Sequence, residues 1–289
     1  LGQAYFLRGL YFFHLVNLFD RIPLPLDMEL YQVQKTREEG WQQVISDFQK
    51  AAELLPVSYS NLNGMDKGHT GRATKGAAMA YLGKSYLFTK DFPKAKEQFE
   101  KVINLGTYSL VANYADNFTT SNENNSESIF ELQFDRNTES IGLGWGGDPR
   151  QEWGKTSARS ITYGPPGFGF NDIQPTKALF NAYQEEKTLD GKVDPRLGAT
   201  MFYNHPGETL YGKDFATNYA SNPAYLNDVF TKKYQNYNTG QIDEFDWRSG
   251  INERLMRYAD VLMMYAECLN ELGSTSQAYD YIQMVRNRV

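Results

Sequence analysis

The sequence is short of cysteine, of histidine and of positive charge. It has one cysteine among 289 residues, Cys268, so it can form neither an intrachain disulfide nor a cysteine-based metal site. The three histidines, His14, His69 and His205, are scattered, and no two of them have the i, i+4 spacing of a zinc site. The formal net charge of −6 argues against nucleic acid, because phosphates require basic patches. We therefore predict no metal, no cofactor and no nucleic-acid partner.

Long apolar runs are also missing. No run approaches the roughly 20 residues that a membrane-spanning helix needs, and no signal peptide is present. The chain begins inside one helical pattern and stops inside another at 287–289, so we expect that any signal or lipid anchor lies outside it. Aromatic residues, by contrast, are abundant at 15%, with 20 Tyr and 18 Phe. Such an excess is typical of binding surfaces that present flat rings, although a tyrosine-rich core would also account for it.

The first third of the chain is helical in pattern. Residues 1–20 are apolar almost all round, which predicts a buried helix with His14 as a core residue. Prolines follow and predict an extended exit. Thr36 and Glu39 then form a capping-box pattern that opens a second helix, and Pro56 ends it.

Two further helical stretches follow the same logic. Residues 71–105 predict two helices with a break at 90–93, and Gly106 supplies the C-terminal stop. A strong helical pattern also runs from Asn252 to the end of the chain, broken at Gly273. Each stretch is therefore expected to form a helical hairpin.

The two hairpins match one repeat template. In the first, Gly83 and Ala95 are the small residues at which the helices cross, and in the last Ala266 and Ala278 stand at the same spacing. Two helices approach closely only where side chains are small, while large flanking residues fill the groove. A tetratricopeptide-like repeat is the prediction, and a chance match of generic amphipathic hairpins is the alternative. Residues of the second helix give a weaker copy: Val44, Phe48, Ala51 and Pro56.

Between the hairpins lies a long region with little regular pattern. Residues 128–134 alternate as a short strand, 176–183 predict a short helix, and 135–175 have no period. The predicted fold class is mostly α, with tetratricopeptide-like hairpins, long irregular insertions and a few short strands. We expect a single domain. Its boundaries are a scaffold of about 1–56, 71–106 and 252–289, and a ligand-facing insertion of about 107–251.

The insertion also contains the residue types of a sugar site. Sugar C–H faces stack on aromatic rings, and sugar hydroxyls need fixed polar partners. Glycines at 142, 144, 146 and 147 would let the backbone approach a ligand. The alternative is that the rings only pack the insertion onto the helices. The candidate ligand-binding residues are Trp145, Trp153, Tyr163, Phe168, Phe170, Asp148, Arg150, Asn171 and Trp247.

Other polar motifs favour structural roles. The run 142–147 is no nucleotide fingerprint, because neither a helix start nor a Lys-Ser/Thr pair follows it. Asp190 and Asp194 flank a polar turn that is too sparse in oxygens for calcium. Glu185 and Glu186 are helix neighbours and do not face each other, so they make a poor acid–base pair. Three charges on the last apolar stretch predict structural ion pairs: Arg257, Asp260 and Glu267.

Taken in order, six segments resemble one known family. The segments are Ala4 to Phe13, Asp20 to Pro25, Gly71 to Ala78, Pro175 to Tyr183, Asp190 to Arg196, and Arg257 to Glu267 followed by Val285-Arg286. Their residues and their order are similar to those of the SusD/RagB family over nearly the whole chain. Complete members of that family are much longer.

The resemblance implies a function without catalysis. Family members are lipoproteins on the outer face of the outer membrane of Bacteroidota-type bacteria. They cover a SusC-like TonB-dependent transporter and deliver glycans, or in some cases peptides, to it. We therefore expect capture of oligosaccharides at the cell surface, with peptide capture, a repeat adaptor for protein partners and a glycoside hydrolase as alternatives. Cys268 lies mid-helix and is not expected to be the lipid anchor.

Overall fold

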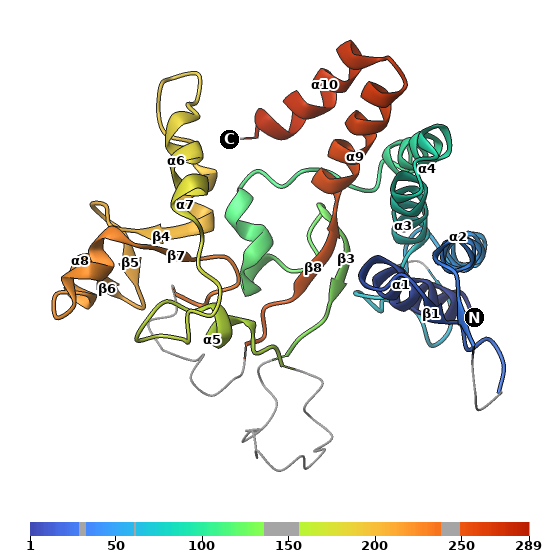
Figure 1. Ribbon diagram of the computed structural model, residues 1–289, viewed down its shortest axis with the longest axis horizontal. Helices are drawn as coiled ribbons and strands as arrows, with labels where there is room; N and C mark the ends of the chain where they lie inside the picture. The colour runs from blue at the N-terminus through green and yellow to red at the C-terminus, as the bar shows by residue number, and fades with distance from the viewer. Residues whose placement is uncertain (29–32, 61, 136–155, 238–248, 289) are drawn as a thin grey trace. The chain divides into compact units, whose positions relative to one another are not determined.

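The structure is a computed structural model that describes residues 1–28, 33–60, 62–135, 156–237 and 249–288 (Figure 1). The chain divides into two compact units. The helical unit comprises Leu1–Leu110, Ser126–Glu131 and Arg254–Asn287. The loop-rich unit comprises the described residues of Val111–Asn125 and Leu132–Glu253, together with Arg288.

The helical unit opens with two packed helices. Helix α1 spans Gly2–Leu18 and α2 spans Arg37–Leu54, and between them β1 (Ile22–Pro23) pairs with β2 (Gln34–Lys35). The predicted capping box is confirmed: the Thr36 hydroxyl accepts from the Glu39 backbone N–H at 3.2 Å, and the Glu39 carboxylate accepts from the Thr36 backbone N–H at 2.8 Å. An ion pair joins the two helices, with Arg8 Nη2 2.6 Å from Oδ1 of the buried Asp47, while the Arg8 side chain is 38% exposed.

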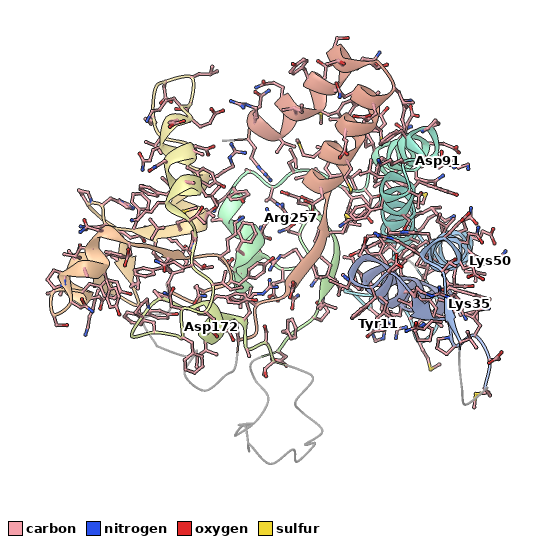
Figure 2. All side chains as sticks on the ribbon, in the orientation of Figure 1. Tyr11, Lys35, Lys50, Asp91, Asp172 and Arg257 are labelled. Carbon is pink, nitrogen blue, oxygen red and sulfur yellow. The ribbon has the colours of Figure 1, made fainter. Side chains whose placement is uncertain are left out.

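One expectation for α1 was wrong. Although the helix is apolar almost all round, only one of its faces is buried. Leu7 and Leu18 are 40% and 75% exposed, and Tyr11, which is labelled in Figure 2, is 67% exposed. His14 lies on this outer face and is exposed, so it is not a core residue. Composition alone predicts burial of the whole helix, but a helix at the surface of a bundle buries only the stripe that faces its neighbours.

The first predicted hairpin is confirmed. Helix α3 spans Lys75–Phe88 and α4 spans Phe92–Asn104, and Gly106 ends the hairpin at a positive φ of 62°. At the crossing, a Cβ added to Gly83 would lie 2.7 Å from the Phe99 ring. Any larger residue at 83 would therefore push the helices apart.

The last predicted hairpin is confirmed over residues 258–286. Helix α9 spans Tyr258–Glu271 and α10 spans Thr275–Arg286, with Gly273 at a φ of +81° between them. The helix predicted to start at Asn252 starts later, because Glu253–Arg257 is strand β8. This strand pairs with β3, Ser128–Leu132, which confirms the strand predicted there.

Neighbouring helices of this unit pack in series, α1 on α2, α2 on α3, α3 on α4, α4 on α9 and α9 on α10 (Figure 1). One continuous core follows the series, from Phe6 and Phe48 through Tyr81 and Phe99 to Ala278. The predicted fold class, mostly α with hairpin repeats and a few short strands, is confirmed.

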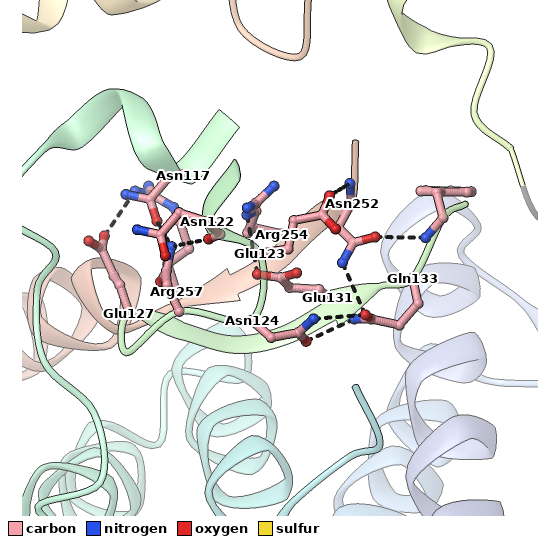
Figure 3. Close-up of polar contacts among 12 residues, drawn as sticks. Asn117, Asn122, Glu123, Asn124, Glu127, Glu131, Gln133, Asn252, Arg254 and Arg257 are labelled. Atoms are coloured by element: carbon pink, nitrogen blue, oxygen red, sulfur yellow. Dashed lines mark hydrogen bonds and ion pairs between the residues drawn. The ribbon is translucent and has the colours of Figure 1, made fainter. Parts of the chain in front are cut away.

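Ion pairs support the β3–β8 ribbon of the helical unit (Figure 3). Arg254 Nε lies 3.2 Å from Glu131 Oε1, and both side chains are 0% exposed. Arg257 lies 3.1 Å from Glu127 and 3.5 Å from Asp260, so the predicted structural role of Arg257 and Asp260 is confirmed. Glu267 is exposed and is not in this network, which corrects its grouping with the other two charges.

The loop-rich unit is made of short elements. Strand β4 (Met201–Tyr203) pairs antiparallel with β7 (Val229–Thr231), with Phe202 opposite Phe230, and β5 (Thr209–Leu210) pairs with β6 (Lys213–Asp214). The region 198–250 therefore contains regular elements that the sequence pattern did not predict. The short helices are η1 (Tyr114–Phe118), η2 (Thr120–Asn122), α5 (Arg159–Tyr163), α6 (Lys177–Glu185), α7 (Arg196–Thr200), α8 (Phe215–Asn218) and η4 (Pro223–Asn227).

Candidate functional site

Five of the nine predicted ligand-binding residues lie outside the described residues. They are Trp145, Asp148, Arg150, Trp153 and Trp247, and the prediction for them stays a prediction. The other four lie in the loop-rich unit, within or just after α5. We build the candidate site from these four and from the residues that surround them.

Residues 161–172 form a folded-back loop on α5. Backbone hydrogen bonds of 2.8, 2.9 and 3.0 Å run from Phe170, Asn171 and Asp172 to the carbonyls of Ile161, Gly164 and Thr162. At the tip, the Phe168 N–H donates to the Pro165 carbonyl at 2.9 Å, and Gly167 has a φ of +85°. Proline followed by glycine at the two central positions is the pattern of a type II turn. The turn therefore presents backbone, and a Cβ at Gly167 would meet nothing within 4 Å.

The four described candidates have different environments. Phe168 is 8% exposed and stacks on Tyr211, with ring centroids 4.8 Å apart and planes 12° apart, so most of its ring serves packing. Phe170 is 54% exposed. Tyr163 and Asn171 are half-buried, and Asn171 adopts a φ of +54°. The loop thus carries an exposed ring at Phe170 and an amide at Asn171 within three residues of Phe168, whose ring stacks on Tyr211.

A groove of about 330 Å³ opens beside this turn. That volume is at the lower end of the range of about 300–1,000 Å³ for small-molecule pockets. We call it the Tyr219 groove. Its lining residues are Pro166, Gly167, Phe168, Asn218, Tyr219, Ser221, Asn222 and Tyr225.

The Tyr219 groove is held together by tyrosine contacts. The Tyr219 hydroxyl donates to the Pro166 carbonyl at 3.0 Å, which ties the turn to the end of α8. Its ring packs edge-on against Phe215 at 5.0 Å and Tyr225 at 5.4 Å. Burial, and next the nearby Tyr225 hydroxyl, raises the pKa of Tyr219, so this phenol stays protonated and continues to donate.

Sequence reasoning found the Phe168 wall of the groove and missed the other wall. Asn218, Tyr219, Asn222 and Tyr225 stand in a stretch that shows no helical or strand period. A signal was available, because two asparagines and a serine stand beside two tyrosines over 218–225, and aromatic rings beside an asparagine also mark the segment 135–172.

The predicted polar turn at 190–196 is confirmed. Asp190 lies 2.5 Å from both the Thr188 hydroxyl and Lys192 Nζ, and these partners lower its pKa to about 2. Asp194 accepts from Arg196 Nε at 3.0 Å. Glu185 is exposed near the end of α6. These carboxylates therefore have structural or solvated positions, as predicted.

The loop-rich unit also buries an ion pair. Glu208, 4% exposed, accepts from Lys232 Nζ at 2.8 and 3.0 Å, and His205 Nε2 lies 3.1 Å away. Lys232 Nζ also lies over the rings of Phe202 and Tyr237, at 5.1 and 4.8 Å. Glu208 is thus a single carboxylate that is paired with a lysine. Glycoside hydrolysis instead uses two carboxyl groups about 5–9.5 Å apart.

Among the residues that the structure describes, no three Cys, His, Asp or Glu side chains are grouped so as to hold a metal ion. None of the helices in the described ranges combines the length and the apolar character needed to cross a membrane.

The helical unit has grooves of its own. One, of about 530 Å³, lies between α2 and the α3–α4 hairpin and is lined by Gln42, Ser46, Gln49 and Tyr86 among others. Another, of about 420 Å³, lies between α9 and α10, where Met263 and Tyr279 are 42% and 65% exposed. Both are lined by repeat helices.

Comparison with known families identifies this architecture. The profile of the SusD family matches residues 126–289. This chain belongs to the SusD family. A second SusD-like profile, described as starch-binding and associating with the outer membrane, matches residues 1–87. The resemblance inferred from the sequence is therefore confirmed.

Individual SusD-like proteins match along the whole chain. SusD-like protein P25 of Formosa agariphila is 27% identical over 100% of this chain. A SusD superfamily protein from Bacteroides vulgatus is 32% identical with a TM-score of 0.80 over 99% of this chain, and a laminarin-binding SusD-like protein is 25% identical with a TM-score of 0.71. The chain spans 55%, 58% and 62% of the lengths of these three proteins.

Proposed function

We propose that this protein captures oligosaccharides without transforming them. Membership of the SusD family supports this, as does the similarity to a SusD-like protein that binds laminarin. The observation that carries the proposal is the Tyr219 groove, where aromatic rings, amides and a hydroxyl line one pocket in a region outside the helical repeats. Rings for sugar faces and fixed polar groups for hydroxyls are what a sugar site needs.

The proposal also covers the predicted segment 135–172 and Trp247. Tyr163, Phe170 and Asn171 flank the turn that lines the Tyr219 groove, so a longer saccharide bound there has further rings and amides within the same loop. Trp145, Asp148, Arg150 and Trp153 belong to the same stretch of sequence, and we propose them as additional contacts.

We further propose that the captured glycan passes to a SusC-like TonB-dependent transporter at the outer membrane, with a lipid anchor outside this chain. The description of the profile that matches residues 1–87 supports the membrane association. The two grooves on the repeat helices favour a protein partner bound to the helical unit, because grooves between helices accept segments of partner proteins. We propose the same division for the predicted boundaries, with a scaffold of about 1–56, 71–106 and 252–289 and a ligand-facing insertion of about 107–251.

Calorimetry tests the capture proposal. The full-length protein is titrated with oligosaccharides and with peptides, and the reaction is followed for released sugar. We expect saccharide binding without products, and weaker binding in Trp145→Ala and Trp153→Ala. Tyr11→Ala is the matched control, because that ring is exposed on α1 of the helical unit. Peptide binding would select the peptide alternative, and binding of neither would leave the adaptor alternative.

A further inference from the structure

We infer that the Tyr219 groove is a subsite for an uncharged sugar and excludes acidic sugars. This inference rests on the proposed function and adds the charge class of the ligand. Its basis is the chemistry of the residues that line the groove, which include no Lys, Arg, His, Asp or Glu among the described residues.

The polar groups of the groove suit hydroxyls. The Asn218 side-chain N–H donates to the carbonyls of Leu210 and Lys213, at 3.2 and 3.4 Å, so its amide nitrogen is engaged and its Oδ1 remains an acceptor. Asn222 precedes η4 and makes no side-chain capping bond. It therefore retains both a donor and an acceptor. Sugar hydroxyls donate and accept as well, and so they match amides on both counts.

Tyr225 supplies the aromatic surface. It is half-buried, and its ring stands edge-on to Tyr219 and Phe230 at 5.4 and 6.0 Å, which fixes the ring. Gly167 also lines the groove, and a Cβ added there would meet nothing within 4 Å, so its backbone is open to a ligand. The groove therefore offers a held aromatic ring and bare backbone to an uncharged group.

An anionic sugar would be bound poorly in this groove. A carboxylate or sulfate that leaves water needs a cation or several donors as partners, and otherwise its burial is costly. Among the described residues, the lining offers the two amides and the Ser221 hydroxyl but no cation. The described lining has no charged side chain to pair with the charged termini of a peptide, which argues against peptide termini as ligands.

The test compares neutral and acidic ligands on the full-length protein. Laminarihexaose and maltohexaose are titrated beside hexagalacturonate and a lysine-containing peptide. We expect a neutral hexasaccharide to bind more tightly than the other two classes. Tyr225→Ala should weaken that binding roughly two- to tenfold, the range expected for a lost aromatic contact. Asn222→Ala, which leaves the aromatic packing intact, should weaken it as well.

A charge variant sharpens the test. Asn222→Lys should improve hexagalacturonate binding by up to about fivefold at low salt, and the gain should disappear at high salt. Asn181→Lys adds the same charge on α6, outside the groove, and should leave binding unchanged.

The outcomes separate the two proposals. Hexagalacturonate or peptide binding as tight as neutral binding in the wild type would overturn the charge inference. Neutral binding that both Tyr225→Ala and Asn222→Ala leave intact would overturn the assignment to this groove and leave oligosaccharide capture standing. If no saccharide binds at all, the proposed function and this inference both fail.

Discussion

The two units bury apolar surface in different ways. In the helical unit, six helices pack in series around one continuous core. Among the described residues of the loop-rich unit, buried apolar residues form two separate clusters, and Phe118 and Ile161 are buried outside both. One contains Phe202, Phe215 and Phe230, and the other contains Leu197, Met201 and Val229. One unit therefore relies on regular helix crossings and the other on aromatic rings gathered between short elements.

This difference has a functional consequence. A hairpin repeat fills its interior with side chains at fixed spacings, so its shape is set by a few small residues such as Gly83. Short elements joined by turns leave side chains such as Tyr225 and Asn222 partly or fully exposed at the surface. Binding residues are often found on loops that a rigid scaffold holds. We propose that the helical unit supplies stability and that the loop-rich unit supplies recognition.

The largest change in stability is expected when a buried ring is removed from the core of the helical unit. Phe99 is 0% exposed and packs on Gly83 at the α3–α4 crossing. Replacing it by alanine removes a buried ring and leaves a cavity, so Phe99→Ala should lower the free energy of unfolding of the helical unit by about 3–5 kcal/mol. Urea-induced unfolding followed by circular dichroism at helix wavelengths measures the loss.

Tyr11→Ala is the control for that experiment. Its ring is 67% exposed on α1, and its loss should change the same free energy by no more than about 0.5 kcal/mol. Equal losses in the two variants would contradict the view that the continuous core determines the stability of this unit.

A second pair of variants compares buried and exposed charge within the helical unit. Glu131→Gln removes the charge that lies 3.2 Å from Arg254 Nε, in a pair whose side chains are both 0% exposed, and should cost about 3–5 kcal/mol. Glu53→Gln removes an exposed partner of Lys50, in a pair whose side chains are 62% and 54% exposed. It should cost at most about 1 kcal/mol. Thermal melting at equal pH and salt measures both; a cost for Glu53→Gln that matches Glu131→Gln would refute the distinction.

These examples also show which features a sequence reveals. The Thr36–Glu39 cap and the crossing at Gly83 were predicted, because their signals lie within one helix or one hairpin. Strand β8 was missed because it is defined by pairing with β3, far away in the sequence, and because Arg254 on it is buried by an ion pair rather than by apolar character. Local patterns predict local structure, and long-range partners remain invisible to them.

The candidate site followed the same rule. The aromatic and glycine content of 135–172 indicated one wall of the Tyr219 groove, at Phe168. The opposite wall, at Tyr219 and Tyr225, comes from another part of the chain, and only the fold brings the two together. The exposed face of α1 at His14 was missed for a related reason, since a helix that is apolar all round does not reveal which side has neighbours.

The smallest effect concerns Cys268, the only cysteine of the chain, which lies on α9 in the helical unit. Burial, and next the charge of Glu267, raises the pKa of its thiol from 9.0 to about 12. At pH 7 the thiol is neutral in both folded and unfolded chains, so it adds no pH dependence there. Between about pH 9 and pH 12 only the unfolded chain ionises, so this stability contribution is complete below pH 9 and is lost as the pH rises.

At pH 8, iodoacetamide should therefore modify the native protein much more slowly than the urea-unfolded protein, because the thiolate is the reactive form. Since the chain has no other thiol, this rate reports opening of the helical unit alone. Equal rates in the native and the urea-unfolded protein would mean that the folded helical unit does not protect this thiol. The proposed contrast between a rigid scaffold and a loop-based site would then lose its basis.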